Sequence, residues 1–516
     1  MFESPVVVAE SFRINKRGPA TDGSRTFKNT SFFTRARQQA DLALRTGRKA
    51  IDDFPDNVLL NIFDFYRLLP TFPKNVYSVW EWHVLAHVCR KWRQVVFASS
   101  DRLGLRLRCT PMTPAREMMD IWPPLPIVVE KPAYLPSLSE VDDDNLIAAL
   151  EERDRVRMIT LPGLTRRQLE RFAEVMLEPF PALTHLYLGS DDEVTPALPA
   201  TFMGGSAPLL QCLSLTGISF PALPNLILSP NNLTSIKLHD IPSTGHISPE
   251  TMVVFLSTLT SLKSLTIEFK SPSSADLTSG RTGPPTRALL PVLIYLRFKG
   301  ASEYLGDMVT QIDTPLLSNL EMVIFNHLNF DIPQLSQFIN RTETLKSLNQ
   351  AELFFDSRFI EIKFFHRDIL SLSLHVPCSQ SHSQLSSIIQ LCGPPLPLPS
   401  SAERLTIHEG IVSPQKWQYD ADHEQWLDIL RLFPFARELY VSDTMWSLLA
   451  PTLTQDTGER TVDVLPLPCD LFLERLESAE SLPETIKPFT ATRKLAGHPV
   501  VFHLREGQDR SWKAVD

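Results

Sequence analysis

The sequence predicts an α/β protein, α+β overall, in which a small helical region precedes a long solenoid with a parallel sheet on its concave face. Two observations support this prediction. Residues 51–100 contain two stretches whose apolar residues follow helical spacing. From about residue 156 onward, a short apolar pattern typical of one strand recurs, and its first seven copies start 23 to 31 residues apart, which is the spacing of structural repeats.

The composition is that of a globular protein with a sizeable core: 516 residues, 43% hydrophobic and 21% charged. The net charge of −9 argues against nucleic acid as the main ligand, because a phosphate-binding surface needs clustered cations. Residues 1–50 carry ten Lys/Arg and four Asp/Glu, a balance of +6, so the remainder carries −15. This basic segment has no sustained apolar period, and we expect it to be disordered.

The six cysteines are far apart and none has the spacing of a metal or redox motif, which indicates reduced thiols in the cytoplasm or the nucleus. The first residues lack the apolar core of a secretory signal. No apolar run reaches the roughly 18–20 residues that cross a bilayer. We therefore expect a soluble intracellular protein without a membrane partner.

Residues 51–100 are expected to form two short amphipathic helices. Asp53 is placed to cap the first helix, and Pro55 suits its first turn. The two apolar stripes comprise Val58, Leu59, Ile62, Phe63 and Phe65, then Val84, Leu85, Val88, Trp92, Val95 and Val96. Two such helices cannot bury this much apolar surface alone, so they need the rest of the chain, a partner or both.

Residues 101–155 are interpreted as strands and a helix that lead into the repeats. Residues 103–109 alternate in polarity like a strand, and residues 127–129 are predicted to form a second one. Residues 142–145 are three aspartates and an asparagine, which favour the start of a helix over 146–150.

Residues 156–516 are predicted to form an irregular leucine-rich-repeat domain with a C-terminal cap. The template is an apolar residue, two variable residues, an apolar residue, one variable residue and an apolar residue, with copies that start at 156, 183, 210, 233, 262, 293 and 317 and looser ones at 348, 369, 402 and 436. Helical patterns such as 167–176 and 249–256 lie between the copies, so strand–helix units stack in parallel. Residues 353–364 are expected to form a hairpin that turns at Asp356 and Ser357.

No catalytic signature is present, so we expect neither an enzyme nor a cofactor. The sequence has no phosphate-binding loop and no nucleophile elbow. His83 and His87 have the spacing of metal ligands, but no glutamate lies between them and no third ligand is evident, which favours partly buried structural histidines.

The outward strand positions of the solenoid are the candidate substrate-binding face. They comprise Tyr187, Ser214, Lys237, Thr266, Arg297 and Glu321, with His239, Glu268 and Lys299 one step further along their strands. This mixture of aromatic, basic and acidic groups suits a protein or peptide ligand better than a uniform polyanion. The alternative is a solvated concave face without a fixed ligand.

Residues 51–100 resemble an F-box. Residues 54–63 (Phe-Pro-Asp-Asn-Val-Leu-Leu-Asn-Ile-Phe) match its first half, and residues 88–93 (Val-Cys-Arg-Lys-Trp-Arg) match its more specific second half. Phe54 replaces the usual leucine, and the linker over 66–82 is longer than usual. Residues 122–128 and 312–317 extend the resemblance to the F-box/leucine-rich-repeat proteins of fungi.

This resemblance implies a substrate receptor of a Skp–cullin–F-box ubiquitin ligase. The F-box would dock onto the Skp-family adaptor, and through it a cullin, while the repeats would hold a protein substrate. The matching positions make up the candidate adaptor-binding set: Phe54, Pro55, Leu59, Leu60, Ile62, Phe63, Val88, Cys89 and Trp92. Some of them must instead form the core of the motif itself. The alternative is a non-ligase scaffold whose F-box-like helices only cap the apolar end of the solenoid.

Overall fold

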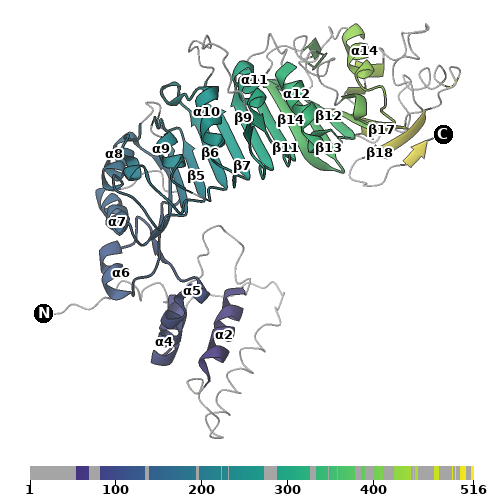
Figure 1. The fold of residues 1–516 in the computed structure, drawn as a ribbon. Coiled ribbons are helices and arrows are strands. Elements are labelled where there is room, and N and C mark those ends of the chain that lie inside the picture. Colours follow the sequence, from purple (N-terminus) through teal and green to yellow (C-terminus); the bar gives the residue numbers. More distant parts are fainter. Residues whose placement is uncertain are drawn as a thin grey trace, which may run out of the picture. The chain divides into compact units, whose positions relative to one another are not determined.

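The computed structural model describes residues 54–68, 82–133, 139–192, 197–271 (except 222 and 231), 287–325, 333–377 (except 347 and 357), 385–386, 388–389, 399–410, 423–442, 445–446, 448–450, 470–475, 491, 494, 500–506 and 513–515. The chain divides into two compact units, Met1–Leu105 and Arg106–Asp516 (Figure 1). Asp53, Ser357 and residues 1–50 lie outside the described part, as does most of the 66–82 linker.

The first unit is helical, with α2 (Asp56–Leu68), α3 (His83–Ala86), α4 (Arg90–Ala98) and α5 (Ser100–Leu103). Its core comprises Leu59, Phe63, Trp82, Leu85, Ala86, Val95, Val96 and Leu103. The ring of Phe63 meets that of Trp92 edge-on, with centroids 4.9 Å apart. This contact packs α2 against α4 and joins the two halves of the motif.

The expected second helix is in fact two. Cys89 has extended backbone angles (φ −157°, ψ 174°), which end the helical path after α3, and its sulfur accepts a hydrogen bond from the Trp92 amide at 3.4 Å. Cys89 is therefore the N-cap of α4. Residues 100–103 form α5, so the expected strand over 103–109 shortens to β1 (Leu107–Cys109).

In the second unit, 17 of the described strands form one continuous sheet. Its first nine strands run parallel in chain order: β1, β2 (Ile127–Glu130), β3 (Val156–Leu164), β4 (His185–Ser190), β5 (Cys212–Thr216), β6 (Ser235–Ile241), β7 (Ser264–Phe269), β9 (Tyr295–Gly300) and β11 (Asn319–Ile324). The strands β1 and β2, expected in a linking segment, are thus the first strands of the sheet. A separate pair joins β8 (Ala288–Leu289) to β10 (Ile312–Asp313).

The order changes after β11. The chain forms a meander of β12 (Gln350–Phe355), β13 (Phe359–His366) and β14 (Ile369–Pro377), in which β14 pairs with β11 and β12 pairs with β15 (Arg404–Glu409). The expected hairpin over 353–364 is confirmed as the β12–β13 pair. The sheet continues through β16 (Glu438–Ser442), β17 (Asp470–Arg475) and β18 (Val501–Glu506) to β19 (Lys513–Val515).

Helices of the second unit lie along one side of this sheet (Figure 1). They are α6 (Ala115–Ile121), α7 (Glu140–Leu150), α8 (Arg166–Val175), α9 (Leu223–Ile227), α10 (Pro249–Leu256), α11 (Ser302–Thr310), α12 (Pro333–Arg341) and α14 (His423–Arg431), with 3-10 turns at Phe202–Gly205, Ser243–Gly245, Glu343–Leu345 and Pro399–Ser401. The core lies between the sheet and these helices. Cross-strand partners form buried rows in it, one of which comprises Leu186, Leu213, Ile236, Leu265, Leu296 and Leu320. Each repeat thus covers the apolar face of its neighbour.

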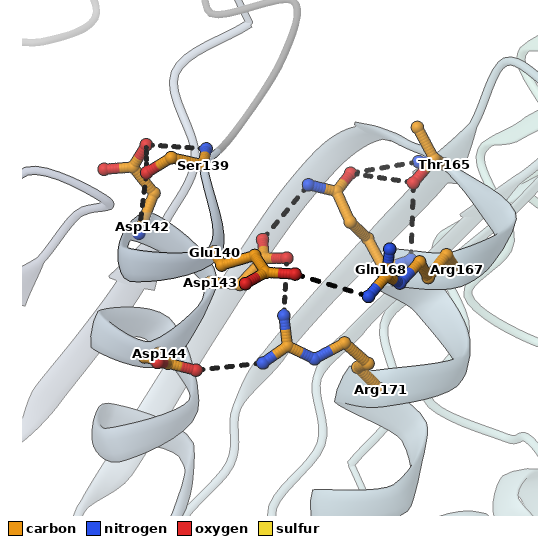
Figure 2. A network of polar contacts seen from close by, with 9 residues as sticks. All are labelled: Ser139, Glu140, Asp142, Asp143, Asp144, Thr165, Arg167, Gln168 and Arg171. Carbon is orange, nitrogen blue, oxygen red and sulfur yellow. Dashed lines mark hydrogen bonds and ion pairs between the residues drawn. The ribbon is translucent and has the colours of Figure 1, made fainter.

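The helix expected over 146–150 begins earlier, at Glu140, because Ser139 caps it. The Ser139 hydroxyl accepts from the Asp142 amide, and the Asp142 carboxylate accepts from the Ser139 amide, which is a capping box. Figure 2 shows how the next acids join α7 to α8: Gln168 and Arg171 both donate to Asp143, and Arg171 also donates to Asp144. These aspartates therefore hold two neighbouring repeats together.

The fold class is confirmed as mixed α/β, with a long and mostly parallel sheet built from repeated strand–helix units. Among the described residues, no helix is long and apolar enough to cross a membrane.

Candidate interaction surfaces

The outward residues predicted at the middle strand positions do line up in the sheet. Tyr187, Ser214, Lys237, Thr266, Arg297 and Glu321 are successive cross-strand partners, and so form one row. The row continues beyond the predicted set through Ser373, Lys363, Glu352, Thr406, Tyr440, Phe472 and His503. We call the sheet face that bears this row the open face.

Not every predicted residue of this face is accessible. Thr266 is 2% exposed and Glu268 is 7% exposed, whereas Lys237 is exposed and the other six are partly exposed. Arg297 is the cross-strand partner of Thr266 and donates to Glu268, so a long side chain of the neighbouring strand engages this part of the face. Thr266 and Glu268 support the face instead of presenting themselves to a ligand.

A first ionic network lies on β6, β7, β9 and β11. Arg297 donates through Nε to Glu268 at 2.5 Å and through Nη1 to Glu321 at 2.9 Å, and His239 Nδ1 lies 3.1 Å from Glu268. The hydrogen bond from His239, assisted by Arg297, lowers the pKa of Glu268 to about 2 despite its burial. Glu268 is thus held ionised between two donors, and Lys299 pairs with Asp240 alongside at 3.2 Å.

A second network lies on the β12–β14 meander and β15. Lys363 Nζ sits between Glu352 at 3.2 Å and Glu361 at 3.0 Å, and 5.8 Å from the centre of the Phe354 ring. His408 Nε2 lies 3.1 Å from Glu352. Aromatic rings flank these charges: Phe359 stacks on His375 at 4.2 Å, and Phe354 meets His408 edge-on at 5.2 Å.

A row of stacked aromatic side chains crosses β16, β17 and β18. Tyr440 lies 4.2 Å from Phe472 with 6° between the ring planes, and Phe472 lies 4.3 Å from His503 with 10° between them. Arg404 covers the Tyr440 ring at 5.4 Å while its Nε donates to Glu438 at 2.6 Å. Because the rings occupy one register row, the strand spacing alone brings them into stacking distance.

Sequence reasoning missed this second half of the open face. The looser repeats after residue 348 still have a residue between their last two apolar positions. The rule that such a residue faces outward therefore also predicts Tyr440 on this face. The hairpin prediction also implied alternate outward residues on β13, such as Glu361 and Lys363.

The first unit presents an exposed apolar surface. Its members are Phe54, Val58, Ile62, Phe65, Tyr66, Val84 and Val88, each at least 36% exposed, with Phe65 the most exposed at 73%. Val58, Ile62 and Phe65 are spaced by four and three residues along α2 and so share one helix face. We call these seven residues the apolar patch.

The predicted adaptor-binding set divides by burial. Phe54, Pro55, Ile62 and Val88 are exposed, and Leu60, Cys89 and Trp92 are partly exposed, whereas Leu59 and Phe63 are completely buried in the core of this unit. Motif matching did not separate these roles, and it left out Val58, Phe65 and Val84.

The two histidines of α3 are exposed, not partly buried as expected. His83 is the first residue of α3 and His87 is its C-cap, whereas Leu85 and Ala86 between them are buried, and the two histidine rings are 6.4 Å apart. Within the described residues, no three His, Cys, Asp or Glu side chains are grouped so that they could hold a metal ion.

Comparison with known proteins adds a weak likeness to solved structures. No protein-family model matches the chain, and no curated protein matches it. Among solved structures, it is similar to the crystal structure of the leucine-rich repeat-containing protein LegL7 from Legionella pneumophila, at 12% identity over 76% of this chain and 98% of that one, with a TM-score of 0.27. The parallel register and the repeated strand–helix units of this chain themselves define an α/β solenoid of the leucine-rich-repeat kind.

Proposed function

We propose that this chain is a substrate-recognition adaptor of a Skp–cullin–F-box ubiquitin ligase. The first unit docks onto the Skp-family adaptor, and the open face of the solenoid binds a protein substrate. The chain itself catalyses nothing in this account, because other subunits transfer the ubiquitin. The cytoplasm and the nucleus are where we expect it to act.

The observation that carries the proposal is the apolar patch on an F-box-like unit. Its core is closed by Leu59, Phe63 and the Trp92 ring, yet Ile62, Phe65 and Val88 stay exposed beside it. Burying one such side chain contributes about 1.5–3 kcal/mol, so a few of them offset the cost of association. An apolar surface of this kind marks a protein-interaction site.

The open face supports the second half of the proposal. Arg297 and Lys363 are each paired with two carboxylates of this face, so these side chains are held in place before a ligand arrives. A fixed mixture of rings, carboxylates and cations matches the composition of protein-binding surfaces. The parallel rows give an extended polypeptide a regular series of contacts.

Affinity capture tests the proposal. The tagged full-length chain and its Ile62→Asp variant are expressed in matched cells, and the captured proteins are identified by mass spectrometry. Wild type is expected to retain a Skp-family adaptor and a cullin, and Ile62→Asp is expected to lose both while keeping the partners of the solenoid. Absence of the adaptor from the wild-type sample would favour the non-ligase scaffold instead.

A further inference from the structure

We infer that the half of the open face formed by β12 to β18 recognises an extended, lysine- or arginine-bearing segment of a partner protein. This inference rests on the proposed role of the open face in binding a protein, and it names the chemistry of that ligand. It is carried by the placement of rings and carboxylates on neighbouring register rows.

This half of the face already binds two cations of its own in the same way. Arg404 lies over the Tyr440 ring and donates to Glu438. Lys363 lies near the Phe354 ring, between Glu352 and Glu361. A ring face beside a carboxylate is therefore a repeated motif here, and it attracts a cation through both the ring quadrupole and the carboxylate charge.

The charges described on this half of the face also favour a basic ligand. The described outward side chains of these strands include four carboxylates (Glu352, Glu361, Glu438 and Asp470) but only two cations (Lys363 and Arg404), a balance of −2 with the histidines neutral. The Asp470 side chain is 49% exposed and next to the stacked rings of Phe472 and His503. Carboxylates can each accept several hydrogen bonds, so they have capacity for a further donor.

The strand register places carboxylates and rings in neighbouring rows. The carboxylates of Glu438 and Asp470 belong to cross-strand partners, as do the rings of Tyr440 and Phe472 one step along the same strands. Adjacent strands lie about 4.8 Å apart, so the carboxylate row and the ring row run side by side across the sheet. An extended segment laid along these rows would present basic side chains to carboxylates and their aliphatic stems to the rings.

Peptide binding tests the inference. The probes are two fluorescein-labelled peptides of about twelve residues, one alternating arginine and serine and the other alternating glutamate and serine, and binding to the full-length chain is followed by fluorescence anisotropy. We expect the arginine peptide to bind at least about tenfold more tightly than the glutamate peptide. The double variant Glu361→Gln/Asp470→Asn should weaken arginine-peptide binding by about fivefold to tenfold, since it removes two charge-assisted contacts.

The matched control is Asp120→Asn/Glu174→Gln, which makes the same charge change at exposed positions on α6 and α8. Binding of the arginine peptide should stay within about twofold of wild type. An equal loss in both double variants would mean attraction to net charge alone and would overturn the inference, as would equal binding of the two peptides. Co-purification of the Skp-family adaptor with the same variants reports on the first unit separately, so failure here is distinguishable from failure of the proposed function.

Discussion

Arg297 and Glu268 form the closest ion pair among the described residues of the open face, with Nε of the guanidinium 2.5 Å from the buried carboxylate. His239 holds the other oxygen of that carboxylate at 3.1 Å. Arg297 and Glu268, both predicted to contact a ligand, therefore bind each other, and we expect this ion pair to stabilise the solenoid.

This arrangement predicts that Glu268 contributes to the stability of the solenoid in a pH-dependent way. Its pKa is lowered from 4.5 to about 2, so its stabilisation is complete above the ordinary pKa and is lost as the pH falls from 4.5 towards 2. We expect Glu268→Gln to lower the free energy of unfolding by about 1–3 kcal/mol at pH 5, and by much less at pH 2.5. Urea unfolding of both proteins at the two pH values measures this, with Glu174→Gln as control; a difference that does not shrink in acid would contradict the account.

The two apolar residues Leu59 and Ile62 of α2 should behave differently on truncation. Leu59 is completely buried and Ile62 is 40% exposed. We expect Leu59→Ala to destabilise the first unit by about 2–5 kcal/mol and Ile62→Ala by less than about 1 kcal/mol. Hydrogen exchange of the α2 and α4 amides, read by mass spectrometry, measures the stability of this unit directly. Similar effects of the two substitutions would contradict the assignment of Leu59 to the core of the first unit and of Ile62 to the apolar patch.

The sulfur cap of α4 gives a third prediction. Cys89 accepts the Trp92 amide hydrogen bond, and a serine hydroxyl at the same position is a stronger N-cap acceptor. Cys89→Ser should therefore leave α4 as stable or more stable, whereas Cys89→Ala should cost about 0.5–2 kcal/mol. Exchange rates of the first α4 amides report on the cap. If the alanine and serine variants exchange alike, the cap contributes nothing.

Two glycines with positive φ, Gly205 and Gly217, allow the cost of a strained backbone to be distinguished from the cost of a steric overlap. Gly217 has φ +65° and a Cβ there would overlap the Ser190 carbonyl oxygen, whereas Gly205 has φ +69° and the nearest atom to its Cβ, on Asn225, is 3.9 Å away. Gly205→Ala should cost about 1–2 kcal/mol from the backbone conformation alone. Gly217→Ala should cost clearly more, because the β4–β5 region must also move. Urea unfolding compares them, and equal costs would show that the overlap relaxes freely.

The sequence was sufficient for the regular part of the fold. The template residues from Val156 to Met322 are all buried, and the last two of each copy lie in the buried rows of the sheet, because spacing alone fixes which side of a strand faces the helices. The Pro249–Leu256 helix also begins and ends where its pattern predicts, since Ser248 caps it and proline occupies its first position.

The rest required information that a single sequence does not contain. The β13–β14 hairpin turns at Arg367 and Asp368, which both have positive φ although neither is glycine or asparagine, so the usual turn signal was missing. Pairing of β14 with β11 depends on tertiary packing and is not encoded by either strand alone. The same limit applies to the first unit, where Leu59 and Ile62 look alike in the motif but differ in burial.

The measurement that tests the central claim most directly is the affinity of the purified full-length chain for a Skp-family adaptor, by isothermal titration calorimetry. The account predicts saturable one-to-one binding of the wild type and a loss of at least about tenfold in Ile62→Asp, with α2 and α4 exchange protection unchanged. The matched control, Asn61→Asp, adds the same charge one position away and should bind like wild type. No binding of the wild type, or equal binding of Ile62→Asp, would contradict the assignment of the apolar patch as the adaptor interface.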